Sequence, residues 1–104
     1  QMDERKAEQG NRVVSPQKLY HVTTPKKAKR YRETGEILSP VRGFDTLAGA
    51  MVWAIKTGRT VIYECDLAAR EAHLLPDHHN EHGRAWWIEG IPMSDARCVV
   101  SGDR

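Results

Sequence analysis

Residues 46–58 carry the strongest structural signal in the chain. Apolar side chains recur there at the spacing of one helical face: Leu47, Ala50, Met51, Ala54 and Ile55. Asp45 or Thr46 can cap the first turn, and Thr57-Gly58 can end the last one. An apolar helix face must pack on a second layer, and a chain of 104 residues can bury one modest core. We therefore expect one compact domain that contains this helix.

Strand patterns precede and follow this helix. Leu19 to Thr23 is rich in β-branched and aromatic residues, and Thr24-Pro25 then predicts a short helix that ends at Gly35. Further extended segments are expected at residues 36–40, 60–66, 85–91 and 96–100, with a polar loop over residues 68–83. Because regular crossover helices do not separate the strands, we predict an α+β domain. Its sheet should be split and mostly antiparallel, with two or three short helices.

The ends of the chain differ from its middle in composition. Residues 1–17 have few apolar side chains and no period, so we expect a flexible arm there, a single domain over residues 18–101 and a tail over residues 102–104. No apolar run approaches the roughly 20 residues of a membrane span, and the polar N-terminus does not fit a secretory signal. The 2 cysteines are too few for a disulfide scaffold. We expect a cytoplasmic protein that does not enter a membrane.

The net charge of +2 conceals two unlike halves. Through Arg59 the chain has 12 basic and 6 acidic residues, which gives +6, and after it 4 basic and 8 acidic residues, which gives −4. The basic run at residues 26–32 can neutralise phosphates, or it can be the solvent-facing side of an amphipathic helix. The asymmetry points to an anionic ligand on one side of the domain.

Three histidines are candidates for a functional role: His21, and the pair His78 and His82. His21 lies within the first strand, where a histidine either satisfies a core hydrogen bond or faces a ligand. His78 and His82 have the i, i+4 spacing of zinc ligands on a helix. However, Pro76 and Gly83 indicate a loop, and no third ligand is fixed, so we expect no metal site.

Three tryptophans must be accommodated in this small domain. Trp53 lies off the apolar stripe of its helix, so it either packs under the N-terminal arm or lines a cleft where a base or nicotinamide ring can stack. Strand alternation places only one of Trp86 and Trp87 in the core. The other one needs a second buried surface or a ligand.

Several short motifs follow one another between residues 18 and 100. They are Leu19-Tyr20-His21-Val22-Thr23-Thr24, Gly35-Glu36-Ile37-Leu38, Gly43-Phe44-Asp45-Thr46-Leu47, Trp53-Ala54, Val61-Ile62-Tyr63-Glu64-Cys65 and residues 83–92. In order and spacing they resemble the ADP-ribosyltransferase-like superfamily. That superfamily includes RNA 2'-phosphotransferases, rifampin ADP-ribosyltransferases and DarT-type DNA-modifying toxins. The resemblance implies the split sheet of that superfamily and NAD as the cofactor.

The resemblance also implies which residues bind NAD. They are His21, Val22, Thr23, Thr24, Arg42, Phe44 and Trp53. His21 matches the histidine that hydrogen-bonds NAD near the nicotinamide-side ribose. Val22 replaces the usual glycine, and Phe44 replaces the tyrosine that stacks on nicotinamide. Arg42 and Arg59 are candidate partners of phosphate groups, because guanidinium forks match phosphate geometry.

A catalytic carboxylate is the remaining part of the family pattern. The transferases place Glu or Asp near the start of the penultimate strand, where it polarises the ribose 2'-hydroxyl and stabilises an oxocarbenium-like transition state. Alignment through Trp86 and Pro92 puts Arg84 at this position and Glu81 three residues earlier. Glu81 can serve if the loop shifts by one turn. Otherwise the site is closer to the phosphotransferases, which lack this carboxylate and hold a 2'-phosphate with basic residues.

Three functions follow from the resemblance. The first is NAD-dependent ADP-ribosyl transfer to a nucleic-acid or protein acceptor, with His21, Glu81 and Arg84 as the catalytic residues. The second keeps the fold but treats it as a binding module for a nucleotide, RNA or protein. The third is an RNA 2'-phosphotransferase-like activity.

Overall fold

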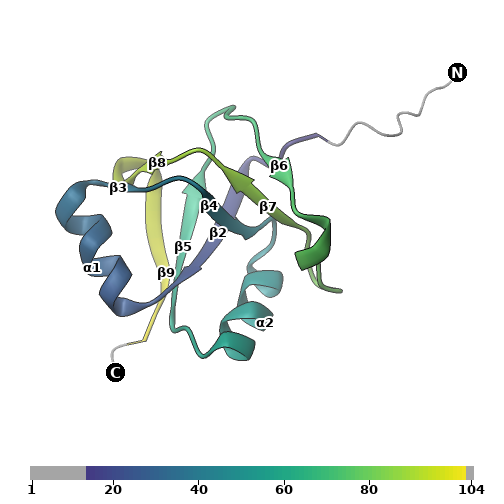
Figure 1. Ribbon diagram of the computed structural model, residues 1–104, viewed down its shortest axis with the longest axis horizontal. Helices are drawn as coiled ribbons and strands as arrows, with labels where there is room; N and C mark the ends of the chain where they lie inside the picture. Colours follow the sequence, from purple (N-terminus) through teal and green to yellow (C-terminus); the bar gives the residue numbers. More distant parts are fainter. Residues whose placement is uncertain (1–13, 103–104) are drawn as a thin grey trace, which may run out of the picture.

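The computed structural model describes residues 14–102 and shows an α+β fold with two α-helices (Figure 1). The strands are β2 (Lys18–Thr23), β3 (Glu36–Ile37), β4 (Val41–Phe44), β5 (Val61–Asp66), β6 (His73–Leu74), β7 (Ala85–Ile88), β8 (Ile91–Pro92) and β9 (Ala96–Ser101). The helices are α1 (Pro25–Thr34) and α2 (Leu47–Thr57), with short 3-10 helices at Pro76–His78 and Met93–Asp95. The predicted α+β class is confirmed.

The strands form a six-stranded sheet in the order β6-β7-β4-β2-β5-β9, and β3 pairs with β8 in a separate two-stranded sheet (Figure 1). The pairs in both sheets are antiparallel, as the sequence predicts. The predicted segment 85–91 divides into β7 and β8. The two expected closing strands are not neighbours, because β7 pairs with β4 whereas β9 pairs with β5 on the far side of β2.

Strands β2 and β4 separate soon after they meet. In the described part of the chain they share the single register pair Tyr20 and Phe44, whereas β2 pairs with β5 from Lys18 to Thr23. Beyond that pair, the Nδ1 atom of His21 lies 2.7 Å from the carbonyl oxygen of Arg42. The His21 side chain thus donates to the Arg42 carbonyl, which in a continuous strand pair would accept from a backbone N–H of the neighbouring strand. The divergence opens the middle of the sheet.

Both helices begin and end where the sequence predicts. The hydroxyls of Thr24 and Thr46 cap α1 and α2, and each accepts a hydrogen bond from the backbone N–H of the helix's third residue. The helices end at Gly35 and Gly58, which have φ values of 86° and 72°. Glycine adopts this left-handed conformation without the steric penalty of a Cβ atom.

The face of α2 that packs on the sheet matches the predicted one only in part, because Ala50 and Ala54 of the predicted stripe are buried. Its buried residues are small: Gly49, Ala50 and Ala54. Leu47, Met51 and Ile55 are exposed, with 77% of Ile55 accessible, so their predicted place in the core is wrong. The reason is a close approach between helix and sheet. A Cβ atom added at Gly49 would lie 3.1 Å from the ring of Phe44, so large side chains cannot occupy this face.

Two apolar clusters lie on opposite faces of the sheet. Alternation along β5 sends Tyr63 into the cluster that contains Ala28 of α1, and sends Ile62 into the cluster that contains Ala50 of α2. This alternation of β5 confirms the prediction from the sequence. Each helix therefore covers one face, and the opening between β2 and β4 lies between the two.

The terminal segments lie at the limits of the described region. Of the predicted arm, residues 1–13 lie outside the described residues, while the hydroxyl of Ser15 donates to the carbonyl of Ala72 and accepts from the N–H of the same residue. Of the predicted tail, Gly102 is described and residues 103–104 are not. Within residues 14–102, neither helix has the length and apolar character needed to cross a membrane.

Candidate functional site

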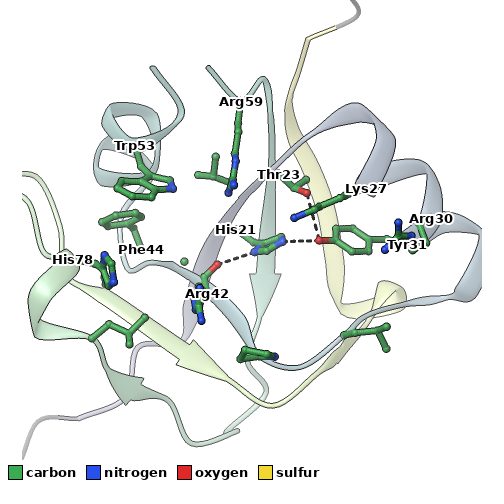
Figure 2. A pocket seen from close by; sticks show the side chains of 16 residues that line it. His21, Thr23, Lys27, Arg30, Tyr31, Arg42, Phe44, Trp53, Arg59 and His78 are labelled. Atoms are coloured by element: carbon green, nitrogen blue, oxygen red, sulfur yellow. Dashed lines mark hydrogen bonds between the residues drawn. The ribbon is translucent and has the colours of Figure 1, made fainter. Parts of the chain in front are cut away.

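A cavity of about 390 Å³ opens where β2 and β4 diverge (Figure 2). β2 contributes His21, Val22 and Thr23, and β4 contributes Arg42, Gly43 and Phe44. Side chains from both helices and from the segment around His78 complete the wall. The volume lies in the range of small-molecule and cofactor sites, and the position of the cavity follows from the divergence of β2 and β4.

His21 is held by two hydrogen bonds at the centre of this cavity (Figure 2). Its Nδ1 atom lies 2.7 Å from the carbonyl oxygen of Arg42, and its Nε2 atom lies 3.1 Å from the hydroxyl of Tyr31. A carbonyl can only accept, so Nδ1 carries the proton and Nε2 of the neutral ring accepts from Tyr31. The Tyr31 hydroxyl also lies 3.4 Å from Oγ1 of Thr23. The sequence left His21 open between a core role and a ligand role, and it lies at a cavity wall.

The surroundings of His21 favour its neutral form. Burial lowers the pKa of His21 below its ordinary value of 6.5. The hydrogen bond to Arg42 opposes this shift, while the positive charges of Lys27 and Arg59 add to it. A neutral His21 retains one donor and one acceptor, both of which are in use.

The stability of the fold should therefore fall at acidic pH through His21. Well above pH 6.5 the ring is neutral in the folded and unfolded chain, so it adds no pH dependence. As the pH falls through 6.5, the unfolded chain binds the proton more readily, and unfolding is favoured until the folded ring also protonates. We expect the loss of unfolding free energy between pH about 7.5 and about 5.5 to be smaller in His21→Gln than in the unsubstituted protein. Urea denaturation at both pH values measures it, and equal losses in the two proteins would contradict the assignment.

An aromatic wall stands across the cavity from Tyr31 (Figure 2). The rings of Phe44 and Trp53 lie 6.3 Å apart between centroids with an interplanar angle of 44°. Trp53 meets His78 edge-on at 6.1 Å. The sequence analysis left Trp53 either under the N-terminal arm or in the wall of a cleft, and in the structure it lines the cavity. These rings provide an apolar surface on which a planar group can lie.

Positive charge surrounds the cavity. Its cationic lining residues in the described chain are Lys27, Arg30, Arg42 and Arg59, and no described Asp or Glu joins them. The basic run on α1 therefore divides, because Lys27 and Arg30 face the cavity whereas Lys26, Lys29 and Arg32 are exposed elsewhere on the helix. A cavity with cations and without carboxylates favours an anionic ligand.

Six of the residues expected to bind NAD line this one cavity: His21, Val22, Thr23, Arg42, Phe44 and Trp53. Arg59, the second expected phosphate partner, lines it too. Thr24 is outside the lining and caps α1 with its hydroxyl. Residues far apart in the sequence thus meet where β2 and β4 diverge.

The two further catalytic candidates lie outside the cavity lining. Glu81 is exposed in the turn closed by the bridge between Asn80 and Gly83. The Asn80 side chain donates to the carbonyl of Gly49, which fixes this turn beside the start of α2. Arg84 is exposed, and its N–H donates to the Asp45 carboxylate over 2.9 Å. Their catalytic roles remain predictions.

The three histidines of residues 78–82 have different surroundings and do not face one another. His78 faces Trp53, and Nδ1 of His79 accepts from the N–H of Ala85 over 2.9 Å. His82 is exposed. Among residues 14–102, no three His, Cys, Asp or Glu side chains gather to hold a metal ion.

Two further cavity residues are Tyr31, which the sequence did not single out, and His78, which it considered only as a zinc ligand. Tyr31 packs against the core cluster that contains Ala28, while its hydroxyl reaches His21. Its amphipathic side chain was the available signal, because a buried tyrosine needs a partner for its hydroxyl. His78 had no such signal, since its position depends on how the loop folds back.

No protein-family model, no curated protein and no solved structure matches this chain.

Proposed function

We propose that this chain binds NAD in the cavity around His21 and transfers its ADP-ribose to a nucleic-acid or protein acceptor. The proposal includes an ADP-ribosyltransferase-like split sheet, with the opening between β2 and β4 as the cofactor cleft. The observation that carries it is the composition of the cavity wall. A neutral histidine, an aromatic pair and a ring of cations offer partners for a ribose, the nicotinamide and the diphosphate of NAD.

Each group has a role that its chemistry supports. The rings of Phe44 and Trp53 provide a surface for the nicotinamide. Arg59 provides a guanidinium group for the diphosphate, and Arg42 provides one for the diphosphate or for a phosphate of the acceptor. In this proposal a ribose hydroxyl replaces the Tyr31 hydroxyl as the partner of Nε2 of His21, and the hydroxyl of Thr23 supplies a second polar atom. In the reaction the bond between nicotinamide and ribose breaks, nicotinamide leaves with the electron pair, and the acceptor nucleophile bonds to the ribose carbon.

Titration calorimetry with NAD tests the binding step, and chromatography of released nicotinamide tests the chemistry. Saturable binding together with nicotinamide release would support the transferase. Binding without release would support the binding-module alternative, because the cleft would then be intact and the chemistry lost. If NAD neither binds nor releases nicotinamide, the proposed cofactor site is wrong.

A second candidate function is an RNA 2'-phosphotransferase-like reaction. It is favoured by the absence of Asp and Glu from the described cavity lining. The four cations there, Lys27, Arg30, Arg42 and Arg59, also exceed what the two phosphates of NAD require. The surplus charge suits a phosphorylated acceptor.

The variant Glu81→Gln should separate these two candidates. If Glu81 is the acidic catalyst, the substitution removes the charge that stabilises the transition state, and nicotinamide release should fall by about 100-fold or more. The phosphotransferase-like reaction does not need this carboxylate, so release of 2'-phosphate from a 2'-phosphorylated RNA should persist in the variant.

The neighbouring substitution His82→Ala is the matched control, since His82 is exposed in the same turn. It should change neither reaction. Unchanged nicotinamide release in Glu81→Gln, without any action on 2'-phosphorylated RNA, would contradict both the role of Glu81 and the second candidate.

A further inference from the structure

Trp87 forms an aromatic stack that neither core cluster uses. As the sequence predicts, only one of the adjacent tryptophans is in the core: Trp86 is 2% exposed, while Trp87 is half-buried on the opposite face of the sheet. The ring of Trp87 stacks on His73, with centroids 4.5 Å apart and an angle of 30° between the planes. His73 is exposed on β6, the edge strand, so the stack has an end open to solvent.

This stack is aligned with the cavity. Trp87 pairs directly with Arg42 on β4 and with His73 on β6, so the three side chains form one row on the same face of the sheet. Arg42 lines the cavity, and neighbouring strands are about 4.8 Å apart. The row therefore extends about 10 Å from the rim of the cavity to the sheet edge.

The chemistry of the row fits a nucleotide strand better than a peptide. An unpaired base offers a flat π-face to the stack, and its phosphate lies about one nucleotide away, where a guanidinium can reach it. A peptide offers a flat ring at few positions and carries no regular anion. Bases in a duplex stack on one another, so their faces are not available to the stack.

We propose that the row His73, Trp87 and Arg42 is a docking surface for single-stranded nucleic acid. A base stacks on the open face of the His73 ring, which Trp87 supports from the other side, and Arg42 holds a phosphate farther along the strand at the rim of the cavity. The docking surface is inferred from the geometry of these three residues and does not depend on NAD binding. Its assignment to the acceptor rests on the function proposed above, because it leads the strand to the place where the ADP-ribose of NAD would lie.

Fluorescence anisotropy of labelled oligothymidylate and oligouridylate, without NAD, tests this surface. We expect Trp87→Leu and His73→Ala each to weaken binding about tenfold or more, since one stacked base contributes an effect of that size. His82→Ala, at an exposed histidine outside the row, should leave the affinity unchanged. Thermal melting of each variant shows that it folds, and the exposed position of His73 makes His73→Ala informative even if Trp87→Leu is unstable.

Arg42→Ala should lower the slope of log affinity against log salt by about one, because one phosphate contact is lost. Arg32→Ala, an exposed arginine outside the cavity lining, should not change the slope. Binding of either oligonucleotide with these effects supports the surface. Failure of both oligonucleotides to bind, equal competition by a duplex, or full affinity in His73→Ala would overturn it. Calorimetry with NAD alone is independent of this result, so failure of the docking surface and failure of the NAD proposal are distinguishable.

Discussion

Gly43→Ala should destabilise the fold by about 3 kcal/mol, which is a large part of the stability of a small domain. A Cβ atom at residue 43 would lie 2.5 Å from the carbonyl oxygen of Tyr20 and 2.9 Å from Cγ of Leu19. The nearest neighbour is backbone and Leu19 is fully buried, so no flexible side chain can move aside. The strands β2 and β4 would have to separate further, and the urea concentration at the midpoint of unfolding should fall accordingly.

Gly35→Ala is the matched control for this substitution. Gly35 has a φ of 86°, and a Cβ atom added there would have no neighbouring atom within 4 Å, so the change adds backbone strain without a collision. We expect it to cost about 1 kcal/mol. Equal stability losses in the two variants would show that the close approach of β4 to β2 does not limit residue 43.

His21→Ala should weaken NAD binding by about tenfold to hundredfold, which is the largest effect expected of a single cavity residue. In the proposed complex the substitution removes the hydrogen bond between the His21 ring and the ribose, and it leaves the ribose hydroxyl without this partner. A lost hydrogen bond that leaves a buried group unpaired has an effect of this size. Titration calorimetry with NAD measures the change.

Tyr31→Phe and Arg32→Ala make this result specific. Tyr31→Phe removes one of the two hydrogen bonds of His21, so its effect on NAD affinity should be smaller than that of His21→Ala. Arg32 is exposed on α1 outside the cavity lining, so its removal should leave the affinity unchanged. If NAD binds with equal affinity to His21→Ala and to the unsubstituted protein, His21 does not contact the cofactor.

The local signals predicted the elements well and their packing less well. Thr24, Gly35, Thr46 and Gly58 mark both helices correctly, because capping depends on groups a few residues apart. The inner face of α2 was predicted correctly at Ala50 and Ala54 and wrongly at Leu47, Met51 and Ile55, because the helix is apolar on several sides and periodicity could not choose among them. The close contact of Gly49 with Phe44 decides it, and that contact joins two elements.

The candidate site was predictable in part for the same reason. The family resemblance named His21, Phe44 and Trp53, and these residues do line one cavity. It did not name Tyr31, whose hydroxyl becomes relevant only when α1 packs against β2. Glu81 could not be placed from the sequence, since its position depends on the contact of the Asn80 side chain with α2.

The sequence by itself determined the α+β class, the two capped helices and the alternation of β5, because these follow from short-range backbone preferences and side-chain periodicity. Only the tertiary structure decided which apolar residues of α2 are buried, where β2 and β4 diverge, and that cations from α1, β4 and the segment after α2 surround one cavity. These features depend on contacts between residues distant in the chain. Such contacts are set by how closely the layers can pack, which no local pattern encodes.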